Sequence, residues 1–142
     1  MEDAEHAIVA MGTLASESRV AAEVLREQGL KTGVVRVRSF RPFPAEELRA
    51  LLEGMKTVVV IDRDISFGYE GALFSEVKAA LYGRTETPVY NLITGLGGRD
   101  VPYTVIAAET EAAVRGKLSS EVSWPTLRLN EHHRASKQGM AR

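Results

Sequence analysis

The run Thr57-Val58-Val59-Val60-Ile61-Asp62 is the stretch that decides the fold. Its β-branched side chains favour a strand, and because apolar residues occupy successive positions, both faces of that strand are expected to be buried. A strand buried on both faces is typical of the centre of a parallel sheet that has helices on either side. We therefore expect this segment to be the central strand of an α/β protein.

Three further segments are expected to be strands of the same sheet. Residues 7–11 form an apolar run that stops at Gly12, and Val89–Ile93 runs into a glycine-rich loop, which are both patterns of buried strands. Residues 32–38 alternate between apolar and polar side chains, so only one face of that strand is expected to be buried. This pattern favours a position at the edge of the sheet.

Amphipathic helices are expected between the strands. Residues 15–28 repeat apolar side chains at helical spacing, with Ser16 placed to cap the helix and Gly29 to end it. Two further helices are expected, one starting at Pro44 and one ending before Gly83.

Beyond residue 101 the pattern leaves two alternatives open. Pro102 suits the start of one long helix, whereas Thr110 suits the cap of a shorter helix over residues 111–117. Helical periodicity does not choose between them.

Strands that alternate with helices over short connections predict a three-layer α/β/α fold with a mainly parallel sheet of four strands. We expect the strand order 2-1-3-4, which places the arginine-bearing second strand at an edge. Residues 1–118 are expected to form this domain. Residues 119–142 are polar and irregular, so we expect a partly disordered C-terminal tail, with Trp124 and Leu127 holding its start on the domain.

Composition excludes several classes of function. Eighteen Lys and Arg against nineteen Asp and Glu leave a formal charge of −1, so no basic surface is expected for nucleic acid or an anionic membrane. The absence of cysteine excludes disulfides, thiolate nucleophiles and cysteine-ligated iron–sulfur clusters in this chain. No apolar run approaches the ~20 residues of a membrane span, and the acidic start is unlike a secretion signal. We expect a cytoplasmic protein.

In a parallel α/β sheet, ligands bind at the carboxyl ends of the strands. Thr13 and Ser16 follow the first strand, where hydroxyls and free N–H groups at a helix start can hold an anion, although capping is their commoner role. Asp62 and Asp64 end the third strand and can bind Mg²⁺ or accept a phosphoryl group, but Arg63 between them favours local neutralisation. No His has a visible nucleophile or carboxylate partner. We therefore expect neither catalytic nor metal-binding residues.

Two loops carry arginines that suit contacts with another protein. The segment Phe40-Arg41-Pro42-Phe43-Pro44, close to Arg38, is either a docking surface for a neighbouring domain or a stiff crossover that covers the core. The glycine-rich loop has Asp100 where a dinucleotide-binding loop has glycine. We expect a tight turn there, held by Arg99 and Asp100, rather than a cofactor site.

Four motifs occur in order along the chain: Ala10-Met11-Gly12-Thr13, Val35-Arg36-Val37-Arg38-Ser39-Phe40-Arg41-Pro42-Phe43-Pro44, Val60-Ile61-Asp62-Arg63 and Gly95-Leu96-Gly97-Gly98-Arg99-Asp100-Val101. In order and spacing they resemble the transketolase C-terminal-like domain of the alpha subunits of pyruvate:ferredoxin oxidoreductases. The similarity extends over residues 4–117.

The resemblance implies an enzyme class that uses thiamine diphosphate, Mg²⁺, coenzyme A and iron–sulfur clusters to interconvert a 2-oxoacid with acyl-CoA and CO₂. The chain has neither the Gly-Asp-Gly element for the diphosphate and metal nor cysteines for clusters. The resemblance therefore implies that this domain binds none of these cofactors and serves assembly. The resemblance implies a contact role for Arg38, Arg41, Arg99 and Asp100. With Thr13 and Ser16 from the expected helix start, these six residues are the candidate interface or anion contacts.

Our leading hypothesis is a non-catalytic domain or subunit of a 2-oxoacid:ferredoxin oxidoreductase, inactive on its own. Its expected partners are the other subunits or domains of that enzyme, with a homodimer of the isolated chain as a further expectation. The alternative is a stand-alone module that binds a nucleotide or anion at the switch point between the first and third strands.

Overall fold

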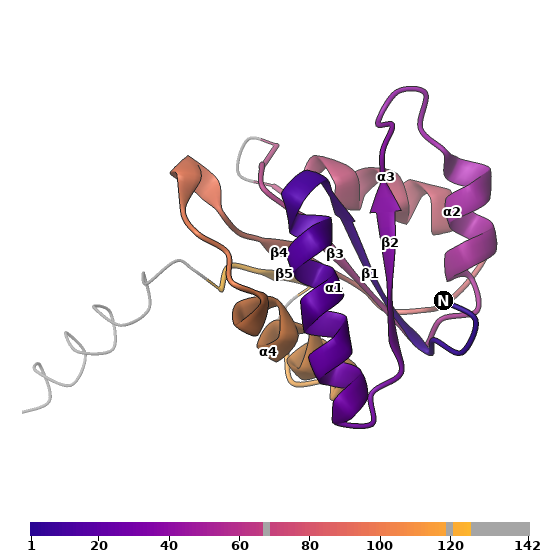
Figure 1. The fold of residues 1–142 in the computed structure, drawn as a ribbon. Coiled ribbons are helices and arrows are strands. Elements are labelled where there is room, and N and C mark those ends of the chain that lie inside the picture. The colour runs from indigo at the N-terminus through magenta and orange to yellow at the C-terminus, as the bar shows by residue number, and fades with distance from the viewer. Residues whose placement is uncertain (67–68, 119–120, 126–142) are drawn as a thin grey trace, which may run out of the picture.

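The computed structural model describes residues 1–66, 69–118 and 121–125, in which strands and helices alternate along the chain (Figure 1). The strands are β1 (His6–Met11), β2 (Thr32–Val37), β3 (Thr57–Asp62), β4 (Val89–Ile93) and β5 (Val122–Ser123). The helices are α1 (Gly12–Glu27), α2 (Ala45–Leu52), α3 (Ala72–Leu81), the short 3-10 helix η1 (Leu96–Gly98) and α4 (Tyr103–Val114).

The strands form one parallel sheet in the order β2-β1-β3-β4-β5. The predicted order 2-1-3-4 is confirmed, and so is the edge position of the alternating strand β2. The predicted number of strands is corrected from four to five, because Val122 and Ser123 pair with β4. A segment of two residues is too short to show the alternating pattern of a strand, so β5 is recognised only by its pairing with β4.

Two hydrophobic cores lie on opposite faces of the sheet, as expected for three layers. Figure 1 shows the helices that cover them, α1 and α4 on one face and α2 and α3 on the other. On one face Ile8, Val59 and Leu92 pack with residues of α1 and α4. On the other face Val9 and Val60 pack with residues of α2 and α3. All six residues of β3 are buried, which confirms the central strand expected from its unbroken apolar run.

The structure corrects one predicted helix start and chooses between the two alternatives for another. Helix α1 begins at Gly12, directly after β1, so Ser16 is an exposed residue of its second turn and not its cap. Helix α4 begins after Pro102, which selects the long helix over the shorter one capped by Thr110. Thr110 is instead fully buried inside α4.

Of the predicted tail, the structure describes residues 121–125. Trp124 is half-buried next to β5, whereas Leu127 and the rest of the expected disordered segment lie outside the described residues. Among the described helices, none combines the length and the apolar character that crossing a bilayer requires.

Candidate functional site

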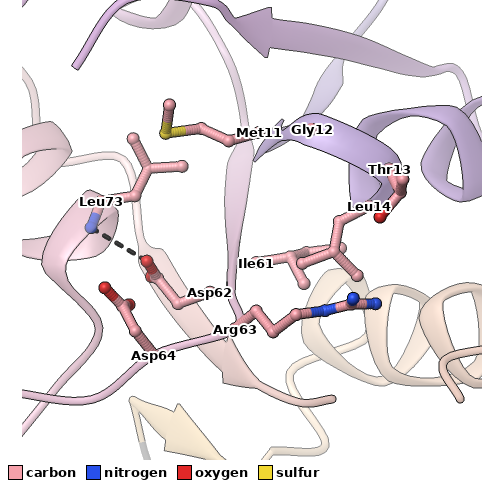
Figure 2. A pocket seen from close by; sticks show the side chains of 9 residues that line it. All are labelled: Met11, Gly12, Thr13, Leu14, Ile61, Asp62, Arg63, Asp64 and Leu73. Carbon is pink, nitrogen blue, oxygen red and sulfur yellow. Dashed lines mark hydrogen bonds between the residues drawn. The ribbon is translucent and has the colours of Figure 1, made fainter. Parts of the chain in front are cut away.

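A cavity of about 480 Å³ opens at the carboxyl ends of β1 and β3 (Figure 2). Since β2 lies on one side of β1 and β3 on the other, this is the switch point of the sheet, where α/β proteins bind ligands. The lining residues come from the ends of β1 and β3 and the first turns of α1 and α3: Met11, Gly12, Thr13, Leu14, Ile61, Asp62, Arg63, Asp64 and Leu73.

The first turn of α1 presents open backbone donors to this cavity. Gly12 has a positive φ of 56°, which lets the chain turn directly from β1 into the helix. Met11 at the N-cap makes no side-chain cap, and the first turn has no acidic residue. Free N–H groups at a helix start carry partial positive charge and favour an anion.

The backbone N–H groups at the start of α3, in the same region, donate hydrogen bonds to side chains. The first four N–H groups of a helix have no partner within it. Here Gly71 N donates to Asn91 Oδ1 at 2.8 Å, Ala72 N to Asp64 Oδ1 at 3.3 Å, Leu73 N to Asp62 Oδ1 at 2.9 Å and Phe74 N to Asp62 Oδ2 at 3.2 Å. Figure 2 shows the Leu73–Asp62 bond at the wall of the cavity. The two helix starts thus differ: α3 has no donor left for a ligand.

Both carboxylate oxygens of Asp62 accept hydrogen bonds from the start of α3. The residue is only 5% exposed, and Asp62 Oδ2 also accepts a hydrogen bond from Asn91 Nδ2 at 2.9 Å. Burial raises the pKa of Asp62 to about 6, and the charge of Asp64 adds to the rise, whereas the helix N–H donors and the Asn91 amide lower the pKa. With both oxygens accepting hydrogen bonds, this geometry favours helix capping over magnesium binding or phosphoryl transfer. Within the described ranges, no group of three or more acidic or His side chains is placed to hold a metal ion.

Arg63 supplies a positive side chain at the edge of the cavity. It is exposed and lines the cavity from the end of β3. The Arg63 side chain lies close to the backbone of Gly95. A Cβ at that position would lie only 2.8 Å from Arg63 Nε, so glycine leaves the room that Arg63 needs. The open helix start and this guanidinium group can together bind an anionic group, and no chemical step follows from them.

The six sequence-predicted contact residues do not gather in one site. Thr13 lines the cavity, whereas Ser16, one turn further along α1, does not. Arg38 is exposed directly after β2. Arg41 pairs with Glu76 of α3 at 2.7 Å and lies 4.3 Å from the centre of the Phe40 ring.

Arg99 and Asp100 lie in the loop after η1. Asp100 Oδ1 accepts a hydrogen bond from Val101 N at 3.0 Å, and Gly95 and Gly97 have φ of 74° and 66°. The expected tight turn with positive φ is confirmed by these angles.

Sequence reasoning missed Asn91. An amide inside the buried strand β4 needs hydrogen-bond partners, and that requirement is the one signal that marks it. Its Nδ2 donates to Val60 O at 3.2 Å as well as to Asp62, so Asn91 connects β4, β3 and the start of α3.

Comparisons with known proteins identify relatives over most of the chain. Residues 4–106 match the model of the family described as pyruvate:ferredoxin oxidoreductase core domain II. The ketoisovalerate oxidoreductase subunit VorA of Pyrococcus abyssi is 44% identical over 133 residues, which are 90% of this chain and 34% of that protein. The pyruvate synthase subunit PorA of Thermotoga maritima is 44% identical over 122 residues, which are 85% of this chain and 31% of that protein.

Two solved structures share the fold at low sequence identity. A split-gene transketolase, described as an inactive beta4 tetramer, has a TM-score of 0.64 at 22% identity and is matched over 80% of this chain and 39% of its own. A 2-oxoglutarate:ferredoxin oxidoreductase from Magnetococcus marinus, with 2-oxoglutarate, coenzyme A and succinyl-CoA bound, has a TM-score of 0.57 at 18% identity. That match covers 79% of this chain and 18% of the enzyme.

The predicted transketolase-like α/β fold is confirmed by the first of these structures. The chain spans about a third of the length of the curated relatives it matches. Since the family match covers residues 4–106 of 142, the chain belongs to the pyruvate:ferredoxin oxidoreductase core domain II family.

Proposed function

We propose that this chain acts as the core domain II of a 2-oxoacid:ferredoxin oxidoreductase, which converts pyruvate, coenzyme A and oxidised ferredoxin to acetyl-CoA, CO₂ and reduced ferredoxin. The observation that carries the proposal is the family match over residues 4–106, together with relatives named as pyruvate synthase and ketoisovalerate oxidoreductase subunits. The relatives are about three times longer than this chain. In this proposal the reacting groups belong to parts of the enzyme outside this chain.

We propose an assembly role within that enzyme. Iron–sulfur clusters need thiolates, and the chain contains no cysteine, so its residues do not fit a cluster. At the carboxyl end of β3, Asp62 is occupied by the start of α3. Thiamine diphosphate, Mg²⁺, coenzyme A and the clusters are therefore assigned to the other domains or subunits in this proposal.

The contacts proposed for assembly are the exposed residues that the sequence singled out: Thr13, Ser16, Arg38, Arg41, Arg99 and Asp100. Two of them also make contacts within the chain, because Arg41 pairs with Glu76 and Asp100 accepts a hydrogen bond from Val101 N. In the same proposal residues 1–118 form the docking domain, residues 119–142 follow it as a tail, and the isolated chain forms a homodimer in the cytoplasm.

Anaerobic purification of the tagged chain from its source tests the assembly role. We expect the tagged chain to co-purify with a subunit that binds thiamine diphosphate. We expect the recovered complex to oxidise a 2-oxoacid in the presence of coenzyme A and to reduce a viologen dye. The chain purified alone is the control and is expected to show no turnover. Turnover by the chain alone, or a recovered complex without a thiamine diphosphate subunit, contradicts the proposal.

The open first turn of α1 and Arg63 favour a second candidate function, a stand-alone module that binds a nucleotide or another anion in the switch-point cavity. Titration calorimetry of the isolated chain with coenzyme A, ATP and NAD separates the two. The assembly role predicts no binding tighter than a Kd of about 1 mM. Tighter binding that is weakened by Arg63→Gln and unaffected by Ser16→Ala supports the stand-alone module instead.

A further inference from the structure

A groove of about 460 Å³ runs between α1 and the edge strand β2, away from the switch-point cavity. Its lining includes three arginines from different parts of the chain: Arg19 of α1, Arg36 of β2 and Arg38 directly after β2. All three are exposed, and among the described residues none of them has an ion-pair partner.

Elsewhere on the surface many cations are neutralised within the chain. Lys31 pairs with Glu5 at 3.3 Å, and Arg115 pairs with Glu111 at 2.8 Å. In the groove itself Arg26 pairs with Asp3. The one other acidic residue of the lining is Glu23, whereas Arg19, Arg36 and Arg38 contribute three positive charges without an ion pair. The groove therefore carries a surplus of positive charge on a chain whose formal charge is −1.

The outer side of β2 is also free for backbone pairing. In the described part of the chain β2 pairs with β1 alone, so the N–H and C=O groups on its other side form an open sheet edge. At the start of the strand, Met1 and Ala4 lie against Gly33, and Arg26 Nη1 donates to Thr32 O at 3.0 Å. An extended segment of another chain can add to such an edge.

The spacing of the arginines fits an extended ligand. Arg36 and Arg38 are two residues apart in extended chain and lie on the α1 side, so their Cα atoms are about 7 Å apart. Carboxylates at alternate positions of a neighbouring strand have the same spacing. Arginine binds carboxylates in a bidentate manner, which makes such a pairing specific in orientation.

We infer that an extended, acidic segment of a partner subunit lies along the outer edge of β2, with alternate Asp or Glu side chains on Arg36 and Arg38 and a further one on Arg19. The inference rests on the proposed assembly role and adds the docking surface and the chemistry of the partner. The chain's own end does not match this chemistry, because the 17 residues after Pro125 carry Arg128, Arg134, Lys137 and Arg142 against Glu131 alone.

Charge reversal with a matched control tests the inference. The tagged chain is purified with its partner from its source as wild type, as Arg36→Glu/Arg38→Glu and as Arg84→Glu/Lys117→Glu. Arg84 and Lys117 are exposed cations that form no ion pair with another described residue, and they lie outside the groove. We expect the groove variant to bind the partner at least about 10-fold more weakly, while the control variant binds as the wild type does. Circular dichroism of all three verifies that they fold.

A photo-cross-linker locates the bound segment. Replacing Glu23, an exposed lining residue of the groove, with p-benzoylphenylalanine is expected to link the chain to a partner peptide that has acidic residues at alternate positions. The inference is overturned if the two charge-reversal variants bind the partner equally well, if the linked peptide is neutral or basic, or if the wild type retains no partner. The identity of the retained subunit reports separately on the proposed function, so either proposal can fail without the other.

Discussion

A Gly71→Ala variant is expected to lose about 3 to 5 kcal/mol of its free energy of unfolding, because the new methyl group has no room. A Cβ at Gly71 would overlap the Asp62 carboxyl group, which is buried and cannot swing into solvent. Gly71 has φ of −68°, so the backbone itself tolerates alanine and the cost is one of contact alone. Moving Asp62 breaks its bonds to Leu73 N and Phe74 N and leaves buried donors unpaired.

Urea unfolding followed by circular dichroism measures this loss, with Gly54→Ala as the matched control. A Cβ at Gly54 meets no atom within 4 Å, and its φ is not in the left-handed region. The control is therefore expected to change the free energy of unfolding by less than about 1 kcal/mol. Equal unfolding midpoints for the two variants would show that the Asp62 cap does not depend on the missing side chain at Gly71.

The stability of the wild-type protein is expected to contain a pH-dependent contribution from Asp62 that an Asp62→Asn variant lacks. The pKa of Asp62 is about 6 in the folded protein, against an ordinary value of 3.8 in the unfolded chain. Between these values the folded state keeps a proton that the unfolded state has released, so raising the pH favours unfolding. The contribution is fully present below about pH 4 and is lost as the pH rises through about 6, with a total near 3 kcal/mol.

Unfolding free energies at pH 4.5 and pH 7 test this dependence. The wild type is expected to be more stable relative to Asp62→Asn at pH 4.5 than at pH 7, by about 2 kcal/mol. Asp3→Asn is the control, because Arg26 lowers the pKa of the exposed Asp3 and its effect has the opposite sign. A constant difference between wild type and Asp62→Asn across this range would mean that Asp62 is ionised in the folded protein throughout.

Much of the architecture was predictable because it follows from short-range patterns. The apolar run at residues 57–62 predicted a strand with the bounds that β3 has, and the alternation from residue 32 predicted an edge strand. Helix starts were less predictable. A hydroxyl at Ser16 is a typical cap, yet α1 begins at Gly12 because the positive φ there turns β1 directly into the helix.

The candidate sites depended on contacts between distant segments. Asp62 was noticed for its charge, but its role as a cap involves Leu73 and Asn91, which lie 11 and 29 residues further along the chain. Arg38 was predicted as a contact residue, whereas Arg19 and Arg36 became part of the same groove only through the packing of α1 beside β2.

The amino-acid sequence by itself determined the alternation of strands and helices, the central and edge positions of β3 and β2, and the exclusion of cysteine chemistry, because each of these is written in neighbouring side chains or in composition. Only the tertiary structure decided that β5 joins the sheet, that the start of α3 is closed while that of α1 stays open, and that three arginines share one groove. Those features arise where segments far apart in the chain satisfy or leave unsatisfied each other's hydrogen bonds and charges, which no local pattern encodes.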